Sequence, residues 1–468
     1  MTAPHRIVES LPRAKEPARV IVIGAGMAGL CAALELKEAG CEVLVLEARN
    51  RAGGRVRTRR DFPEGLYIEE GATRFPDVHH LTMHYINRFA LPLITFNRPD
   101  NGDVLRIMGQ DVESHPWHQD DWPAQLPLHQ HERAMTLAEL TDFYLTPLWE
   151  ELGDPLEPGW PGDDVHRRWD DIDYATMLRS RGASEGAIHA LSLGFHVGNG
   201  PESVSALWWR EAMALDSDSR VAYKIAGGND LLADAFLSQL GDDVRFGCHV
   251  QRLEQDSSGV TVYFDTPSGS RQAHADFAVC TLPLPLLAGF DFEPALPTEQ
   301  REAFATVPYA TLSRVALQCR ERFWLERNRS GFEHTDELIA ELWDLTTGEP
   351  GKRGVLVAYT GGEEAAAVTA MSPEERVHHT IKQLETLLPE LDEYVEAGTS
   401  MCWDEDPLAL GGGAWYRPGQ RHLRELLPLP HGRVHFAGEG TSIWPGWVQG
   451  AFESGRRATR EIVEVIGV

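Results

Sequence analysis

Cysteine is scarce in this sequence, and its spacing suits neither cross-linking nor metal binding. The 468 residues include six widely separated cysteines, at positions 31, 41, 248, 280, 319 and 402. With no CxxC pair and no His/Cys cluster at metal-ligand spacing, a disulfide framework and a zinc site are excluded, and we expect no metal. Buried free thiols in a reducing compartment are expected instead, which favours the cytoplasm.

Positive charge is also in deficit. Lysine and arginine total 43 against 71 acidic residues, a formal net charge of -28. Such a chain repels phosphate backbones and anionic membrane surfaces. We therefore expect no nucleic-acid partner and no membrane partner.

Long apolar runs are missing as well. Residues 1–18 contain no apolar stretch of the kind that a signal peptide needs. The uncharged run 20–34 is too short and too rich in glycine to cross a bilayer, which takes about 20 apolar residues. Neither secretion nor membrane insertion is expected.

What the sequence does have is a globular composition, with 42% hydrophobic and 24% charged residues, and a length that favours two or more domains. Near the start, an apolar run at 20–23 leads into a glycine-rich turn, a stretch rich in alanine and leucine, and a second apolar run at 43–46. This order predicts strand, helix, strand, as in a parallel α/β sheet.

The glycine-rich turn carries a dinucleotide-binding pattern. Gly24, Gly26 and Gly29 form GxGxxG, which provides the tight turn, a close backbone approach to pyrophosphate, and helix-strand packing. Glu47 ends the second predicted strand, where an acid accepts hydrogen bonds from ribose hydroxyls. An acid there favours an unphosphorylated ribose, and hence NAD or FAD over NADP.

Two further segments favour FAD. The continuation "EARNRAGGRVRT" places Gly54 and Arg55 just past the acid, where backbone nitrogens and a guanidinium can hold pyrophosphate oxygens. Near the other end, "FAGEGTSIWPGWVQGAFESG" places Gly438 and Glu439 after a predicted strand and before a helix. The start of that helix can hold an electron-rich flavin edge through its backbone amides and dipole.

These motifs occur in an order that resembles the flavin-containing amine oxidase superfamily over nearly the whole chain, and "EEGATRFPDVHHLTMHYINRFALPL" resembles its L-amino-acid oxidase branch. The resemblance implies an α/β fold in which a Rossmann-like FAD-binding domain is interwoven with a mixed-sheet substrate domain and a helical insertion. It implies FAD contacts at Gly24, Gly26, Gly29, Glu47, Gly54, Arg55, Gly71, Ala72, Val250, Gly438, Glu439 and Val448. We assign 15–76, 220–305 and 405–468 to the FAD-binding domain, 77–125 and 306–404 to the substrate-binding domain, and 126–219 to the helical region.

For the substrate, the resemblance implies that Arg74 and Tyr359 bind an amino acid carboxylate, while Gly446 and Trp447 line the pocket that faces the flavin. The chemistry agrees, because the arginine fork matches a planar carboxylate with two parallel hydrogen bonds. Glu69 and Glu70, just before Arg74, are interpreted as solvated charges.

The sequence departs from the family in two places. Arg314, in "TLSRVALQ", occupies the position of a lysine that usually holds a water near flavin N5, so it is a candidate catalytic residue or else a surface arginine of a strand. Some relatives attach flavin to a cysteine in the element matching "LALGGGAWYRPG", but no cysteine follows Cys402. We therefore predict non-covalent FAD.

The predicted function is FAD-dependent oxidative deamination of L-amino acids by O2, yielding 2-oxo acids, ammonia and hydrogen peroxide. Substrates with large apolar or aromatic side chains are preferred in this prediction, because the middle of the chain is rich in tryptophan and the chain is acidic. Three alternatives stay open: an amine or polyamine oxidase, an amino acid 2-monooxygenase of the same fold, and a flavoprotein without turnover. A homodimer is also left open.

Overall fold

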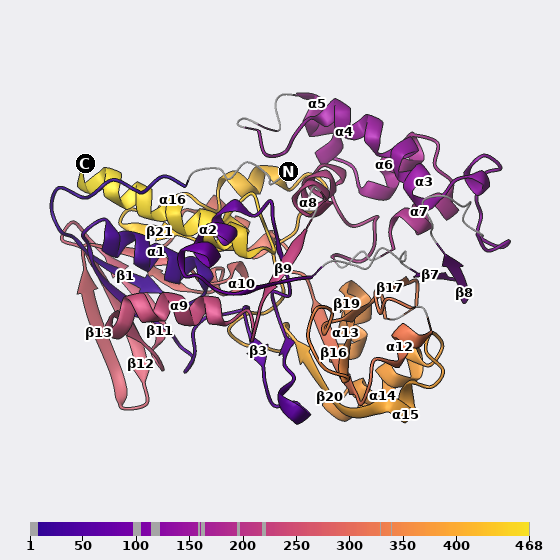
Figure 1. Ribbon diagram of the computed structural model, residues 1–468. Helices are drawn as coiled ribbons and strands as arrows, with labels where there is room; N and C mark the ends of the chain where they lie inside the picture. The colour runs from indigo at the N-terminus through magenta and orange to yellow at the C-terminus, as the bar shows by residue number, and fades with distance from the viewer. Residues whose placement is uncertain are drawn as a thin grey trace.

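A computed structural model describes residues 8–96, 104–113, 122–157, 160, 164–193, 197–217, 221–327, 329–337 and 339–467. The first body of the fold, at the left of Figure 1, contains a parallel five-stranded sheet built from segments far apart in the sequence. In spatial order its strands are β10 (Val244–Arg245), β2 (Glu42–Leu46), β1 (Arg19–Ile23), β14 (Phe277–Cys280) and β21 (Val434–Phe436). The predicted α/β class is confirmed.

Helices cover one face of this sheet, and a second sheet covers the other. Alternate residues of β1 enter different cores: Val20 and Val22 pack with the helices, whereas Ile21 and Ile23 pack with the antiparallel strands. The helices are α1 (Met27–Glu38), α9 (Leu231–Leu240) and α16 (Val448–Ile466), and α16 lies across α1 in Figure 1. The covering strands are β13 (Gly269–Ala275), β12 (Val260–Thr266), β11 (His249–Gln255) and β15 (Asp291–Glu293), followed by α10 (Leu284–Leu287) and α11 (Thr298–Thr306).

A seven-stranded mixed sheet forms the second body of the fold, at the lower right of Figure 1. Its strands, in spatial order, are β20 (Val395–Cys402), β16 (Leu312–Cys319), β19 (Gly354–Gly361), β18 (Glu341–Asp344), β17 (Glu333–Thr335), β7 (Val104–Ile107) and β8 (Gln110–Glu113). On one face, Val315, Leu317 and Leu356 pack against the helix side chains Val368, Ile381 and Leu384. The helices of this body are α12 (Phe323–Glu326), α13 (Gly362–Thr369), α14 (Pro373–Leu384) and α15 (Leu391–Tyr394).

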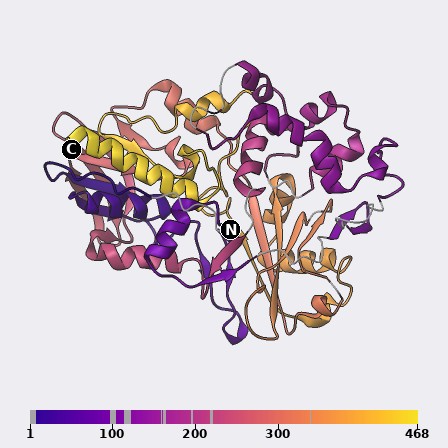
Figure 2. The same ribbon diagram turned by 45° about the horizontal axis from the view of Figure 1, so that its top comes forward.

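The helical region lies beside this sheet, on the same side of the FAD-binding part in both views (Figures 1 and 2). Its helices are α3 (Leu137–Tyr144), α4 (Thr146–Leu152), α5 (Asp164–Asp170), α6 (Tyr174–Ser180), α7 (Glu185–Leu191) and α8 (Ala206–Ser217). Helix α3 begins with a capping box: Thr136 accepts a hydrogen bond from the Glu139 backbone, and Glu139 accepts one from the Thr136 backbone. Pro147 stands in the first turn of α4, where its missing N–H is tolerated.

Short elements join the bodies. They are β3 (Thr58–Arg59), β4 (Ile68–Glu69), β5 (Phe75–Pro76), β6 (Leu93–Thr95), β9 (Ala222–Ile225), α2 (His80–Arg88), and the 3-10 turns η1 (Pro63–Gly65), η2 (Glu132–Ala134), η3 (Gly241–Asp243), η4 (Arg421–Glu425) and η5 (Glu439–Thr441). The chain leaves the first body through β4 and β5 and returns through β9, which pairs with β5 and β6. This path of the chain supports the assignment of separate segments to interwoven domains, which remains a proposal.

The six cysteines are all free and buried, as predicted. Among the described residues, no group of three or more His, Cys, Asp and Glu side chains is placed to hold a metal ion. Within the same part of the chain, no helix has both the length and the apolarity needed to cross a membrane.

Candidate active site

One cavity of about 1810 Å³ connects all three parts of the fold. It begins at the carboxyl ends of β1 and β2, passes the start of α16, and continues between the seven-stranded sheet and the helical region. Ligands of open parallel sheets bind at such strand ends. Every site residue named from the sequence lines this cavity, with the exception of Gly29.

Gly29 lies behind the cavity wall, where helix α1 meets strand β1. A Cβ atom on Gly29 would stand 2.0 Å from the Gly24 carbonyl oxygen, so only glycine permits this contact. Gly24 has a φ of +103°, and a Cβ there would stand 2.6 Å from the Thr281 hydroxyl. A Cβ on Gly26 would meet nothing within 4 Å. The open side of Gly26 therefore faces the cavity, as a pyrophosphate approach requires.

Glu47 lies at the end of this cradle and is 8% exposed. One carboxylate oxygen accepts the Ala25 N–H at 2.7 Å, and the other accepts the Arg49 N–H at 2.8 Å. These two bonds fix the acid at the end of β2 and tie it to the glycine turn. The donors and acceptors present here fit the adenosine and pyrophosphate portions of FAD, and Val250 lines the same end.

Arg55 and Glu439 form the next part of the wall. Both terminal nitrogens of Arg55 stand 3.0 Å from one Glu439 oxygen, which also accepts the Tyr309 hydroxyl at 2.5 Å. The second Glu439 oxygen accepts the Gly446 N–H at 2.7 Å. This network holds the loop before α16 in place, and Trp447 caps the helix without a side-chain bond. The start of α16 thus borders the cavity at Trp447 and Val448, where the positive end of the helix dipole lies.

At the substrate end, Arg74 lies between two tryptophan rings. Its guanidinium carbon is 5.5 Å from the Trp343 ring centroid and 5.6 Å from that of Trp447. Tyr359 stands nearby, with its ring 5.9 Å from the Trp343 ring. Burial raises the pKa of Tyr359, so its hydroxyl stays protonated and can donate a hydrogen bond. The structure therefore brings together the arginine, the tyrosine and the tryptophan predicted from the sequence.

Arg314 is not a surface arginine. One of its terminal nitrogens donates to the carbonyls of Glu69, at 3.0 Å, and Gly71, and to the Thr73 hydroxyl at 2.7 Å. Its guanidinium carbon also lies 4.8 Å from the centroid of the Tyr359 ring. The side chain fastens the segment that leads to Arg74 onto strand β16.

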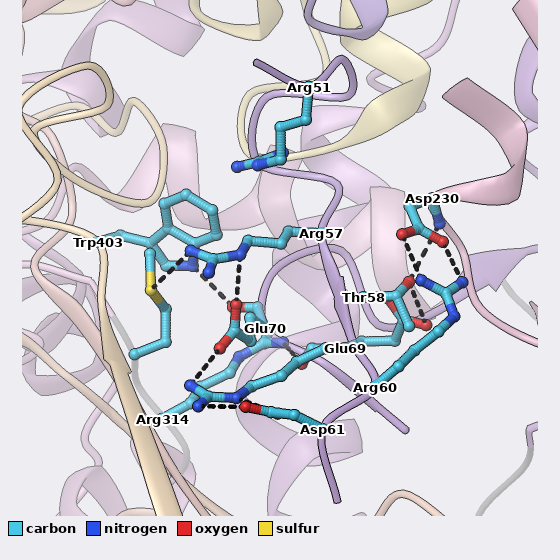
Figure 3. A network of polar contacts seen from close by, with 12 residues as sticks. Arg51, Arg57, Thr58, Arg60, Asp61, Glu69, Glu70, Asp230, Arg314 and Trp403 are labelled. Carbon is cyan, nitrogen blue, oxygen red and sulfur yellow. Dashed lines mark hydrogen bonds and ion pairs between the residues drawn. The ribbon is translucent and has the colours of Figure 1, made fainter. Parts of the chain in front are cut away.

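Glu69 and Glu70 are buried, so interpreting them as solvated charges was wrong. They are 4% and 2% exposed. Glu70 pairs with Arg57 at 2.7 Å, and its backbone oxygen accepts from the Trp403 indole at 2.8 Å. Figure 3 shows the Arg57 guanidinium pointing at the Glu70 carboxylate with Trp403 beside it. The physical reasons differ: Glu69 lies in β4, which pairs with β3, and accepts from Thr58 and Asn229, whereas Glu70 is enclosed by Arg57 and Arg59.

The burial of Glu69 predicts a pH dependence of stability. Burial raises its pKa from 4.5 to about 8, while the Thr58 hydroxyl and the Asn229 N–H donate to it. The folded chain therefore holds a proton that the unfolded chain releases between pH 4.5 and 8, so this contribution to stability is lost as pH rises through 8.

Glu69→Gln, which is neutral at every pH, removes that loss. We expect the melting temperature of the variant, relative to the unmodified protein, to rise between pH 5 and pH 9. Thermal unfolding followed by circular dichroism at each pH measures this. A constant difference across the range would contradict the assignment.

Sequence reasoning missed Tyr309, Trp343, Glu341 and His334, which also line the cavity or its network. Glu341 and Trp343 stand on either side of the apolar Leu342 in "ELWD", a spacing that puts both on one face of a strand. The pattern does not reveal which face meets a cavity.

Comparison with known proteins identifies this arrangement. Residues 27–463 match the family described as flavin containing amine oxidoreductase. The chain belongs to this family. The chain is similar to YobN of Bacillus subtilis (strain 168), which is named as a candidate L-amino-acid oxidase. The identity is 30% over 469 residues, covering 97% of this chain and 97% of YobN. The L-amino acid oxidase Lm29 of Lachesis muta is 28% identical, covering 95% of this chain and 87% of Lm29.

Two solved oxidases share the fold. Cyclohexylamine oxidase from Brevibacterium oxydans IH-35A aligns with a TM-score of 0.81 at 24% identity, over 97% of this chain and 100% of that one. A triple mutant of putrescine oxidase aligns with a TM-score of 0.83 at 24% identity, over 96% of this chain and 99% of that one. The chain is therefore a flavin-dependent oxidoreductase whose cofactor is FAD.

The positions of the cysteines predict that FAD is bound non-covalently. Cys248 is the cysteine that lines the cavity, and it stands beside Val250 at the end assigned to adenine, away from Trp447 and the start of α16. We expect acid precipitation of the holoprotein to leave a colourless pellet, with all flavin absorbance in the supernatant. Yellow colour retained on the denatured protein would contradict non-covalent binding.

Proposed function

We propose that this flavin amine oxidase deaminates L-amino acids oxidatively. An L-amino acid, O2 and water are converted to a 2-oxo acid, ammonia and hydrogen peroxide. The observation that carries the proposal is Arg74, a guanidinium set between two tryptophan rings inside the cavity and beside Tyr359. A planar carboxylate is the ligand that such a fork matches best, and a simple amine has no group to offer it.

The residues of the site act mainly by positioning the substrate. Arg74 and the Tyr359 hydroxyl hold the carboxylate, which fixes the orientation of the substrate α-carbon and its amino group. Trp447 and Gly446 lie at the start of α16 and border the space where that carbon is placed. Bound FAD supplies the two-electron acceptor and returns the electrons to O2. The imino acid formed from the substrate takes up water and releases ammonia.

Arg314 acts in this proposal as a positioning residue. Its three donated bonds hold the backbone from Glu69 to Thr73, directly before Arg74. One terminal nitrogen of Arg314 donates to those acceptors and the guanidinium lies over the Tyr359 ring, so the side chain helps to position both carboxylate-binding residues. Proton handling by Arg314 itself, expected from the family position, stays a prediction.

Product analysis tests the proposal. The purified holoprotein is mixed with L-amino acids and with primary amines and polyamines, and 2-oxo acid, ammonia, amide and hydrogen peroxide are measured. Equal amounts of 2-oxo acid, ammonia and peroxide are expected from L-amino acids. An amide product would identify a 2-monooxygenase, and turnover of amines alone would identify an amine oxidase. Flavin that is not bleached anaerobically by any of these compounds would identify a protein without turnover.

We also propose that the small-molecule substrate and O2 are the partners of the chain and that it acts in the cytoplasm, since its six thiols are free and buried. The homodimer left open by the sequence is checked by light scattering of the holoprotein.

A further inference from the structure

A row of polar side chains crosses the seven-stranded sheet toward the helical region. The register pairs Arg314 of β16 with Tyr359 of β19, Tyr359 with Glu341 of β18, and Glu341 with His334 of β17. Residues paired in this way point to the same face of a sheet. All four line the cavity. The carboxylate-binding residues therefore continue, strand by strand, into an acid and an imidazole.

Glu341 is a carboxylate built into the cavity wall. It is 4% exposed, and one oxygen accepts the Trp343 indole N–H at 2.6 Å. The other oxygen stands 3.0 Å from Nδ1 of His334, which carries charge only when protonated. A buried carboxylate is costly unless opposite charge or strong hydrogen bonds meet it. A carboxylate can accept further hydrogen bonds beside these two, so a cation in the cavity can also pair with Glu341.

The position of Glu341 relative to Arg74 limits which ligands can contact both side chains. Glu341 is the cross-strand neighbour of Tyr359, one strand spacing of about 4.8 Å away. The Trp343 indole that donates to Glu341 is the ring over which Arg74 stands. A ligand whose carboxylate lies on Arg74 and Tyr359 thus has Glu341 within the reach of one long side chain. The Trp343 side chain contacts both Arg74 and Glu341 and offers apolar surface to a methylene chain.

The outer part of the cavity carries the same sign of charge. Glu139 and Asp142 of α3 line the cavity and are exposed, so the cavity reaches the surface beside this helix. With a net charge of -28 on the whole chain, this opening attracts cations and repels anions. A cationic substrate is therefore favoured both on entry and at the inner wall.

We propose that Glu341 forms a side-chain subsite that selects L-amino acids ending in an ammonium or guanidinium group, such as L-lysine, L-ornithine and L-arginine. The inference rests on the proposed function and deepens it. The proposed substrates keep an apolar methylene stem, which packs on Trp343, as the tryptophan-rich sequence predicts. At the end of the side chain, a cation paired with Glu341 replaces the apolar or aromatic group that the sequence predicts.

The test compares L-lysine with L-norleucine, which lacks only the terminal amine. In the holoprotein we expect kcat/KM to favour L-lysine by about 100-fold, because only its terminal ammonium can donate a charged hydrogen bond to Glu341. In Glu341→Gln the preference should fall to below about 5-fold, while Glu341→Asp should retain most of it. Glu363→Gln, the same chemical change on an exposed residue of α13, should leave the ratio unchanged. FAD content and melting temperature confirm that each variant is folded.

A preference for L-norleucine, or an L-lysine preference that survives in Glu341→Gln, would overturn the subsite; Glu341 would then only orient Trp343 beneath Arg74. Cadaverine and n-pentylamine, the decarboxylated counterparts, separate this failure from failure of the proposed function. If these amines are oxidised and neither amino acid is, the proposed function fails. The subsite is then judged by the same ratio, cadaverine over n-pentylamine, in the same proteins.

Discussion

Arg74→Met is expected to lower kcat/KM for L-amino acids by about 30- to 5000-fold, chiefly through KM, while FAD stays bound. Loss of one partner of a charged, hydrogen-bonded pair in a dry pocket costs about 2 to 5 kcal/mol, and about 1.4 kcal/mol corresponds to a factor of ten. Methionine keeps much of the volume between Trp343 and Trp447 but offers no donor to a carboxylate. Steady-state peroxide production over a range of substrate concentrations measures the change.

Two controls make the Arg74 result specific. Arg88→Met changes an exposed arginine of α2 that pairs with Glu38, and its kinetics should match those of the unmodified protein. Arg74→Lys keeps the charge without the fork, so its kcat/KM should lie between the two. Unchanged KM in Arg74→Met, with FAD fully retained, would place the substrate carboxylate elsewhere in the cavity.

Gly29→Ala and Gly26→Ala are expected to abolish or weaken FAD binding for different reasons. The new Cβ at Gly29 would lie 2.0 Å from the Gly24 carbonyl oxygen, so α1 must move away from β1. Overpacking of this kind costs about 1–3 kcal/mol, and the displaced turn no longer presents its amides to the pyrophosphate. At Gly26 the Cβ meets no protein atom within 4 Å and φ is -70°, so the fold accepts alanine.

The pair therefore separates folding from cofactor contact. Gly29→Ala should melt lower than the unmodified chain in both apo and FAD-loaded forms. The Gly26→Ala apoprotein should have the same melting temperature as the unmodified apoprotein. It should bind FAD at least about tenfold more weakly, since its methyl group occupies the approach to the pyrophosphate. Apoprotein titrated with FAD, followed by flavin fluorescence, gives both affinities. Full FAD affinity in Gly26→Ala would show that the pyrophosphate does not approach this glycine.

The sequence predicted the FAD-binding half of the fold well because its signals are local. The glycine turn, Glu47 and the apolar runs on either side of α1 follow one another within 30 residues, and their spacing fixes strand, helix and strand. Further along the chain, β11 and β12 form an antiparallel hairpin, whereas the neighbouring Val244 and Arg245 join the parallel sheet as β10. A two-residue strand is too short to show the alternation of apolar and polar residues from which a strand can be predicted.

The substrate half was predicted less completely because it depends on register and burial. Glu69 and Glu70 look like surface charges until Arg57 and the β3–β4 pairing enclose them. Glu341 becomes part of a site only because β18 aligns it with Tyr359, which lies 18 residues further along the chain. Arg314 was identified by its position in the family, but its acceptors, the carbonyls of Glu69 and Gly71, are visible only in three dimensions.

The parallel sheet also sets when the protein can take up its cofactor during synthesis. Strand β1 begins at Arg19, whereas β21 and the helix that covers α1 are made from residues after 433. Glu439, which holds Arg55, lies in the same late segment. A growing chain therefore carries an exposed apolar α1 face until residues 448–466 have been synthesised, so FAD capture follows the synthesis of this segment.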